Sequence, residues 1–259
     1  MIKIAIPANM PTAITHLQAA GRNVKFANGG DLGWVEGANS RNFIVRLRSF
    51  DIPIVVDDSC DVGLCGSDVY EERKKVFDFG LEILDRFSYG RVFGTSPRLE
   101  LVVTKENSIK NPKEIKPGTI ILTEHPHLTK EFLEDNGVKV SILGENSAAT
   151  TLPGEFRNWC TREGRVGVQV VHGRIPALVR LGAGLGVMVN ETGATILANE
   201  LKVVAKLQDI EMLLVADRKA LKDGQKGVEI KKLAKDLEQA YFTISLEYET
   251  SIINHEREL

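Results

Sequence analysis

The chain has 259 residues, of which 43% are apolar, and that fraction is enough to fill one large hydrophobic core or two smaller ones. Lysine and arginine number 33 against 35 aspartates and glutamates, so the formal net charge of −2 excludes the basic excess typical of nucleic-acid-binding proteins. No apolar run reaches the ~18 residues of a membrane span, and the N-terminus has no signal-peptide core. Three cysteines are too few for a disulfide framework. We therefore expect a cytoplasmic chain without a membrane or nucleic-acid partner.

Short strands and helices alternate through the first part of the chain. Isoleucines at positions 2, 4 and 6 alternate with other residues, which predicts an opening strand. Proline in a first turn and aspartate at a cap favour helix starts. The elements expected next are a helix at 11–20, a strand at 23–27, a helix that begins at 51–53, a strand at 61–66 and a charged helix that runs from Ser67 or Asp68 through Lys75.

The middle of the chain predicts three buried strands and one surface helix. The strands are expected at 99–104, 119–123 and 138–143, and the helix at 127–136. Residues 144–165 are polar and contain Pro153 and Gly154, so we expect a long loop or a lid there.

The alternation returns after residue 165, with a strand at 166–171, a helix at 174–181 and strands at 185–189, 203–207 and 212–216. The tail predicts one long amphipathic helix from the spacing of its apolar residues Ile230, Leu233, Leu237, Ala240, Tyr241 and Ile244. This order indicates an α/β chain with mainly parallel sheets and two lobes. In such folds the ligand lies in the cleft between the lobes, at the carboxyl ends of strands.

The turn at residues 190–197 is the strongest local signal for a binding site. Gly193 lets the backbone approach an anion, and Thr192 and Thr195 offer hydroxyl groups on either side. Consecutive amides at a turn into a helix favour negative charge. The alternative is an ordinary strand-to-helix turn with a threonine cap.

A second segment with polar and glycine residues covers residues 48–68. Arg48 offers a two-pronged contact to phosphate, and Gly63 and Gly66 allow close approach of a flat ring. In the alternative interpretation Asp51 and Asp68 cap helices and Arg48 forms an ion pair.

Histidine and cysteine patterns predict no metal site. His125 and His127 flank Pro126 at the end of a predicted strand, where a pocket could open. None of the five histidines has metal-ligand spacing, and no Ser-His-Asp or Cys-His constellation stands out.

Four segments, in this order along the chain, resemble motifs of the ATP phosphoribosyltransferase family, which carries out the first step of histidine biosynthesis. They are residues 48–53, 61–68, 122–129 and 192–201. The last, Thr-Gly-Ala-Thr-Ile-Leu-Ala-Asn-Glu-Leu, is similar to the family's Thr-Gly-x-Thr-Leu-x-Ala-Asn-Gly-Leu. The likeness covers about residues 1–245, and the chain resembles the short, catalytic-only form of the family.

The resemblance implies a two-lobed fold like that of type II periplasmic binding proteins. Lobe I is expected at 1–97, completed by 198–259 with the C-terminal helix, and lobe II at 98–197 with the phosphate loop. The implied reaction transfers the phosphoribosyl group of phosphoribosyl pyrophosphate (PRPP) to N1 of ATP, with Mg²⁺ and release of pyrophosphate. The implied partners are these small substrates, further copies of the chain and a separate regulatory subunit.

The resemblance also assigns residues to substrates. Thr192, Gly193, Ala194 and Thr195 are expected to hold the 5-phosphate of PRPP. The nucleotide side is expected to include Asn9, Arg48, Asp51, Asp61, Gly63, Gly66, Asp68 and His125. Displacement at an anomeric carbon with cationic character would depend mainly on positioning and charge neutralisation.

The sequence departs from the family pattern at several places. Residues 173–176 lack the acid of the family's Gly-Ser-Val-Glu, and residues 144–165 resemble an insertion. The N-terminal loop, Pro7–Pro11, lacks two cations of the family motif, and the two acids expected before the phosphate loop fall among Gly184, Leu185, Met188 and Val189. Glu191 is the nearest carboxylate and is the residue expected to take the catalytic role. These departures keep two alternatives open: a non-catalytic binding or regulatory subunit of the same fold, and a related enzyme acting on another small anionic substrate.

Overall fold

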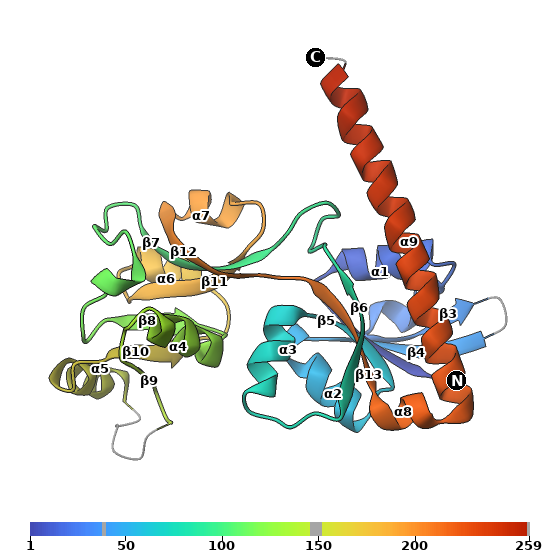
Figure 1. The fold of residues 1–259 in the computed structure, drawn as a ribbon, viewed down its shortest axis with the longest axis horizontal. Coiled ribbons are helices and arrows are strands. Elements are labelled where there is room, and N and C mark those ends of the chain that lie inside the picture. The colour runs from blue at the N-terminus through green and yellow to red at the C-terminus, as the bar shows by residue number, and fades with distance from the viewer. Residues whose placement is uncertain (38–39, 146–151, 258–259) are drawn as a thin grey trace. The chain divides into compact units, whose positions relative to one another are not determined.

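The computed structural model describes residues 1–37, 40–145 and 152–257, and the chain folds into two compact units. Unit 1 comprises Met1–Ser96 and Ile210–Leu259, and unit 2 comprises Pro97–Asp209 (Figure 1). The chain first passes from unit 1 to unit 2 after Ser96, one residue from the boundary predicted at 97. The chain returns to unit 1 after Asp209, later than the boundary predicted at 198. The reason is that β12 (Leu201–Asp209) pairs along β7 (Arg98–Thr104) and therefore belongs to unit 2.

Unit 1 is built on a seven-stranded sheet in the order β2-β3-β4-β1-β5-β13-β6. The strands are β1 (Lys3–Pro7), β2 (Asn23–Phe26), β3 (Leu32–Gly37), β4 (Ser40–Leu47), β5 (Val62–Gly66), β6 (Leu81–Phe87) and β13 (Met212–Asp217). Only the central pairs β1–β4 and β1–β5 are parallel, and antiparallel strands extend the sheet on both sides. The sheet is therefore mixed rather than mainly parallel.

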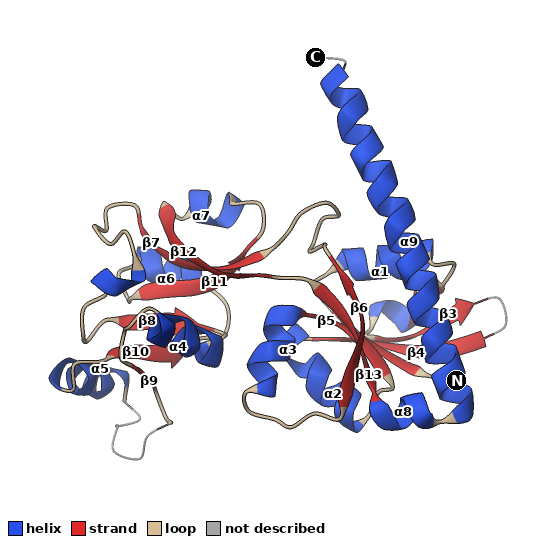
Figure 2. Ribbon diagram, in the orientation of Figure 1, coloured by secondary structure: helices blue, strands red, loops and turns tan. Residues whose placement is uncertain are grey.

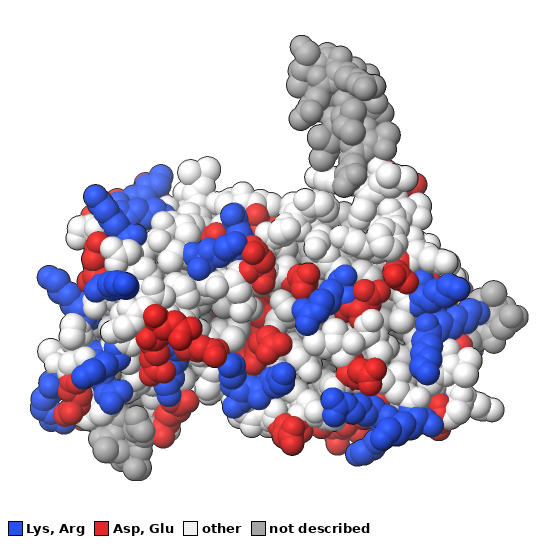
Figure 3. Space-filling view, viewed as in Figure 1, with Lys and Arg blue, Asp and Glu red and all other residues white. Residues whose placement is uncertain are grey.

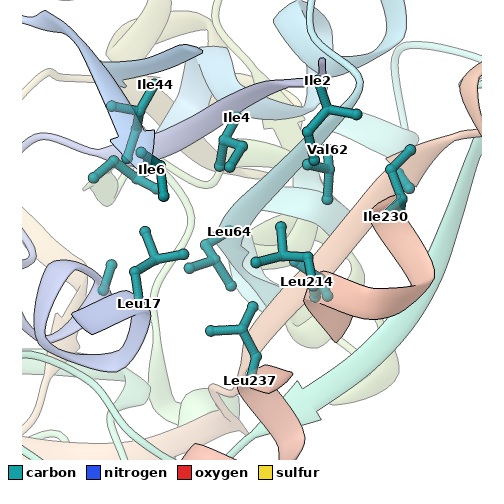
Figure 4. Close-up of a cluster of buried hydrophobic side chains, with 14 of the residues drawn as sticks. Ile2, Ile4, Ile6, Leu17, Ile44, Val62, Leu64, Leu214, Ile230 and Leu237 are labelled. Carbon is teal, nitrogen blue, oxygen red and sulfur yellow. The ribbon is translucent and has the colours of Figure 1, made fainter. Parts of the chain in front are cut away.

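Alternation along β1 divides the core of unit 1 between the two faces of the sheet. Ile4 and Ile6 face α1 (Pro11–Ala19) and α9 (Gly224–Arg257), where Leu237 joins the same cluster (Figure 4). Ala5 faces the opposite way, toward α2 (Ile52–Asp58). Successive residues of a strand point to opposite faces, so one strand supplies both cores. The other helices of the unit are α3 (Ser67–Lys74) and α8 (Arg218–Lys222).

The long C-terminal helix predicted from the tail is confirmed, and it packs on unit 1. Ile230, Leu233 and Leu237 are fully buried in the cluster that contains the β1 isoleucines. The C-terminal part of the helix extends past the rest of its unit (Figure 1), and Phe242 and Leu246 are exposed.

Unit 2 is built on a six-stranded sheet in the order β12-β7-β11-β8-β10-β9. Its remaining strands are β8 (Ile120–Thr123), β9 (Val140–Ile142), β10 (Val166–Val170) and β11 (Leu185–Asn190), and its helices are α4 (Pro126–Asp135), α5 (Pro153–Arg162), α6 (Ile175–Arg180) and α7 (Ala194–Ala198) (Figure 2). Strands β9, β10, β8 and β11 run parallel, whereas β7 and β12 are antiparallel to their neighbours.

The interpretation of residues 144–165 as a loop or lid is wrong for their second half, which forms α5. Pro153 occupies the first turn of this helix, where a missing backbone N–H costs nothing. Phe156 and Cys160, four residues apart, are fully buried against the sheet, and Trp159 stacks on Phe156. The signal lay in that spacing, which marks one face of a helix. Residues 146–151 lie outside the described residues.

Lysines, arginines, aspartates and glutamates are interspersed on the face drawn in Figure 3, in keeping with the near-neutral charge of the sequence. Among the described helices, none has both the length and the apolar character needed to cross a membrane.

Candidate functional site

The parallel strands of unit 2 bring three loops to one edge of the sheet. Strands β8, β10 and β11 are hydrogen-bonded neighbours, with Val170 and Val187 both paired to Thr123. Each strand ends in a short loop that leads into a helix, α4, α6 or α7 respectively. The carboxyl edge of parallel strands is the usual ligand-binding edge of an open α/β sheet.

The loop after β11 carries the predicted phosphate-binding residues and is open to solvent. Thr192, Ala194 and Thr195 are exposed, and Glu191 just before them is half-buried. Gly193 adopts a left-handed conformation with φ of 78°, and a Cβ added there would meet no atom within 4 Å. The space beside this glycine is therefore free for a ligand to approach the backbone.

Two local hydrogen bonds shape this loop. The Gly193 amide donates to Asn190 Oδ1 at 3.0 Å, and the Ala194 amide donates to Thr192 Oγ1 at 3.4 Å. Such bonds also occur in ordinary strand-to-helix turns. Exposure and the open space at Gly193 are what make this turn able to receive an anion.

The neighbouring loops add a carboxylate and a cation at the same edge. Glu124 Oε1 accepts a hydrogen bond from the Gly173 amide at 3.0 Å, and His172 Nδ1 lies 3.8 Å from the same oxygen. Arg174 is exposed, with a left-handed φ of 60° at the start of α6. Glu124 therefore ties the loop after β8 to the loop after β10.

His125 lies at this edge but is buried. Its side chain is buried, with 2% exposed, and its backbone amide donates to Thr123 Oγ1 at 2.9 Å. The residue precedes α4, and its side chain makes no capping hydrogen bond to that helix. His127 faces elsewhere and pairs with Glu145 at 3.2 Å.

Unit 1 gathers most of the predicted nucleotide-side residues at the carboxyl edge of its own parallel strands. Asn9 follows β1, and Arg48 and Asp51 follow β4. Gly66 ends β5, and Asp68 comes two residues later. Asn9 and Arg48 are exposed, Asp51 is half-buried and Asp68 is buried. The loops meet directly, since the Ala8 amide donates to Leu47 O at 2.8 Å.

The structure does not bring Asp61 and Gly63 to that edge. Asp61 precedes β5 at the opposite end of the strand, where it accepts hydrogen bonds from the Lys3 amide at 2.7 Å and from Lys226 Nζ at 2.8 Å. The hydrogen bond that Lys226 donates to Asp61 raises the pKa of Lys226. A Cβ at Gly63 would lie 2.7 Å from the Val56 side chain, so this glycine allows α2 to pack closely. Both residues hold the core together.

The sequence reasoning missed Glu100, which lies beneath the phosphate loop. Its carboxylate is buried, accepts a hydrogen bond from Asn190 Nδ2 at 2.6 Å and pairs with Arg98 Nε at 3.2 Å. A single acid within the apolar run 99–103 was the available signal, since an acid buried in a strand needs a partner.

No group of three or more potential metal-ligating side chains occurs in the part of the chain that the structure describes. Met188, one of the positions where the resemblance places an acid, packs in the core of unit 2 with Ile175 and Ile196. Glu191 and Glu124 are the carboxylates that the loops of this edge carry.

Similarity to known proteins agrees with this layout. The ATP phosphoribosyltransferase (HisG) family model matches residues 48–239, a range that includes the phosphate loop and excludes Asn9. The chain is 28% identical over 207 residues to the ATP phosphoribosyltransferase of Pyrococcus furiosus, covering 80% of this chain and 82% of that relative. It is 30% identical over 178 residues to the Petrotoga mobilis enzyme, covering 66% of this chain and 64% of that protein, so it spans less than two thirds of this second relative.

Solved structures show the fold. The ATP phosphoribosyl transferase (HisG:HisZ) complex from Thermotoga maritima matches with a TM-score of 0.64 at 20% identity, covering 92% of this chain and 100% of the matched chain. The alkanesulfonate-binding protein SsuA from Xanthomonas axonopodis matches with a TM-score of 0.56 at 10% identity, covering 97% of this chain and 76% of that one. The predicted α/β fold of the periplasmic-binding-protein type is thereby confirmed, and the chain belongs to the ATP phosphoribosyltransferase family.

Proposed function

We propose that this chain is an ATP phosphoribosyltransferase that joins the phosphoribosyl group of PRPP to N1 of ATP and releases pyrophosphate, the first step of histidine biosynthesis. One observation carries the proposal: the family match spans residues 48–239 and includes an exposed Thr-Gly-Ala-Thr loop at the carboxyl edge of the unit 2 sheet.

The Thr192–Thr195 loop suits the 5-phosphate of PRPP. A phosphate group accepts hydrogen bonds through several oxygens, and hydroxyl groups and backbone amides are neutral donors that match it. Thr192 and Thr195 supply two exposed hydroxyls, while Gly193 leaves room for the phosphate beside the backbone. Arg174, exposed on the loop before α6, supplies positive charge in the same unit.

We assign ATP to the carboxyl edge of unit 1. Arg48 presents an exposed guanidinium, which suits the triphosphate, and Asn9 presents an amide for hydrogen bonding. Glycine at position 66 leaves room for the carboxylate of Asp68, which a Cβ there would displace. Asp51 and Asp68 remain candidates for orienting the ribose or the base.

The chemistry that these residues support is displacement by positioned reactants. The bond between C1 of the ribose and the pyrophosphate oxygen breaks, with the electron pair leaving on pyrophosphate, while ATP N1 supplies the pair for the new bond to C1. Holding both reactants in line supplies much of the rate. Glu191, next to the phosphate loop, is the carboxylate we assign to stabilising positive charge on the ribose.

Mg²⁺ is best treated as part of the substrate. Magnesium in such reactions is commonly held by substrate phosphates, water and one or two carboxylates rather than by a protein cage. Among the described residues no cluster of three ligating side chains would form such a cage. We therefore propose that the ion arrives bound to PRPP.

Assembly and location are also part of the proposal. The matched Thermotoga maritima structure is a HisG:HisZ complex, which supports a separate regulatory subunit for this chain. We also propose that the chain assembles with further copies of itself. Its substrates, ATP and PRPP, are metabolites of the cytoplasm, and we place the protein there.

A non-catalytic relative of the same fold is the second candidate, because Met188 lies in the hydrophobic core where the resemblance places an acid. Incubation of the purified chain with ATP, PRPP and Mg²⁺, alone and with a regulatory subunit from the same source, tests the choice. Formation of phosphoribosyl-ATP, identified by mass spectrometry with stoichiometric pyrophosphate, supports the enzyme. Binding of PRPP without any product in either mixture would favour the second candidate.

A further inference from the structure

A continuous chain of polar contacts runs from the exposed Arg98 on β7, through two buried side chains, to the phosphate loop. Arg98 Nε lies 3.2 Å from Glu100 Oε1, and Glu100 Oε2 accepts a hydrogen bond from Asn190 Nδ2 at 2.6 Å. Asn190 Oδ1 in turn accepts the Gly193 amide at 3.0 Å. Glu100 and Asn190 are buried, with 3% and 6% exposed.

Strand register explains why these side chains meet. Strands β7 and β11 pair antiparallel, with Met188 opposite Glu100 and Asn190 opposite Arg98. Glu100 and Asn190 are therefore diagonal neighbours on one face of the sheet, within reach of each other's side chains. Asn190 is also the last residue of β11, so its side chain can serve the strand and the loop at once.

The contact with Glu100 fixes the orientation of the Asn190 amide. A carboxylate oxygen accepts only, so the NH₂ group must face Glu100 and the carbonyl oxygen must face the loop. That carbonyl oxygen then accepts a hydrogen bond from the Gly193 amide. The bond holds Gly193, the residue of the 190–195 loop with a left-handed φ, in place. A buried acid whose partner is lost would carry a large desolvation cost, so the arrangement is energetically well determined.

We propose that Glu100 and Asn190 are positioning residues: the pair sets the backbone of residues 190–195 in the shape that receives the phosphate of PRPP. The purpose given to the loop rests on the proposed function. The contacts themselves do not depend on it, because they form without any ligand.

A role confined to strand pairing is the competing explanation, and exchange of the two partners separates it from positioning. Asn190→Asp places two carboxylates face to face. The double variant E100Q/N190D restores the pair with donor and acceptor exchanged. The new amide at position 100 would donate to the new carboxylate at position 190, and that carboxylate would still accept the Gly193 amide. The net charge of the double variant equals that of the wild type.

The first measurement is PRPP binding by calorimetry in the presence of Mg²⁺. We expect N190D to weaken PRPP binding about tenfold or more, because a misdirected loop loses hydrogen bonds to a charged group. We expect the double variant to return to within about threefold of wild type by the same argument. In steady-state assays the apparent KM for PRPP should rise in N190D while that for ATP stays unchanged.

The second measurement needs no substrate. Hydrogen exchange of the peptide that contains Gly193 and Ala194 should accelerate in ligand-free N190D and return toward wild type in the double variant. Glu100→Leu removes the acceptor while burying an apolar side chain, so it provides the same test if N190D does not fold. Gln208→Glu is the matched control, because it adds a carboxylate to the neighbouring part of the same sheet, opposite Leu99.

The outcomes separate the two proposals. Failure of the wild-type chain to bind PRPP would overturn the proposed function. PRPP binding that N190D and E100L leave unchanged would overturn the positioning role alone. Hydrogen exchange at Gly193 that stays at the wild-type rate in both N190D and E100L would overturn the positioning role, whatever the PRPP result. A double variant that binds PRPP no more tightly than N190D would overturn it as well.

Discussion

The Arg22 guanidinium lies 2.6 Å from Asp236 and joins the turn after α1 to α9. Its other amine lies 3.1 Å from Glu229, and only 3% of the Arg22 side chain is exposed. Glu229 also accepts from Asn42 Nδ2, and Asn42 Oδ1 accepts the Ile2 amide. One arginine thus connects the C-terminal helix to the sheet at the start of the chain.

Replacing Arg22 with Met should lower the free energy of unfolding by about 2 kcal/mol or more, because it leaves two partly buried carboxylates without their cation. Urea denaturation at neutral pH measures this. Lys25→Met is the matched control: Lys25 and Glu36 form an exposed pair, for which the expected loss is about 0–1 kcal/mol. Equal midpoints for both variants would mean that the buried network contributes no more than a surface ion pair.

His16 makes the stability of unit 1 depend on pH. Burial lowers its pKa below the usual 6.5, against the raising effect of its contact with the Leu237 carbonyl. The ring lies 2.8 Å from that carbonyl oxygen and 2.9 Å from the Tyr89 hydroxyl. Neutral imidazole fits both partners, since Nε2–H donates to the carbonyl and Nδ1 accepts from the hydroxyl.

The sign of the effect follows from this lowered pKa. Below pH 6.5 the unfolded chain binds a proton that the folded chain does not, so stability falls as the pH drops from 6.5 toward the folded pKa. His16→Gln should flatten the difference between unfolding free energies measured at pH 7.5 and 5.5. A wild-type and a variant curve that run parallel over this interval would contradict the assignment.

Local pattern was enough to predict β1, α1 and α9 because each one buries a periodic set of apolar residues. The hairpin of β3 and β4 gave no such signal: Val35 and Ile44 are buried, whereas Leu32 and Phe43 are exposed. Formation of this hairpin depends on strand pairing across the sheet, where β4 lies along β1. Pairing between distant strands cannot be read from one strand's own sequence.

The same limit applied to the candidate site. Thr192–Thr195 could be identified because glycine between two hydroxyl residues is a local feature, and the structure places it at the carboxyl edge of a sheet. Asp61 looked equivalent to Asp68 in the sequence, but the two lie at opposite ends of β5. Glu100 was missed because its partner Asn190 is ninety positions away and is reached only through the β7–β11 register.

Two leucines on α9 should respond very differently to truncation. Leu237 is fully buried in the unit 1 cluster, whereas Leu246 is 67% exposed. Leu237→Ala should cost about 2–5 kcal/mol through lost burial and a cavity, and Leu246→Ala should cost almost nothing. Thermal and urea unfolding measure both. A comparable loss for Leu246→Ala would show that the end of the helix is covered in solution, for instance by a second copy.

Thr192 provides the most direct test of the phosphate loop. Thr192→Val keeps the shape of the side chain but removes its hydroxyl, so PRPP binding should weaken by about 1–3 kcal/mol. The Ala194 amide also loses its acceptor, which the exposed position allows water to replace. Calorimetry with PRPP and Mg²⁺ measures the change, and the thermal midpoint should stay near that of the wild type.

The matched control for this experiment is Thr243→Val, because Thr243 is an exposed threonine on α9 whose hydroxyl donates to the Gln239 carbonyl of its own helix. Its removal should leave PRPP affinity unchanged. Inorganic phosphate is a second probe, which distinguishes contacts to the 5-phosphate from contacts to the rest of PRPP. If the loop holds the 5-phosphate, Thr192→Val weakens the binding of phosphate and of PRPP by a similar factor. A PRPP affinity that is unchanged in Thr192→Val would show that Thr192 is not part of the binding site.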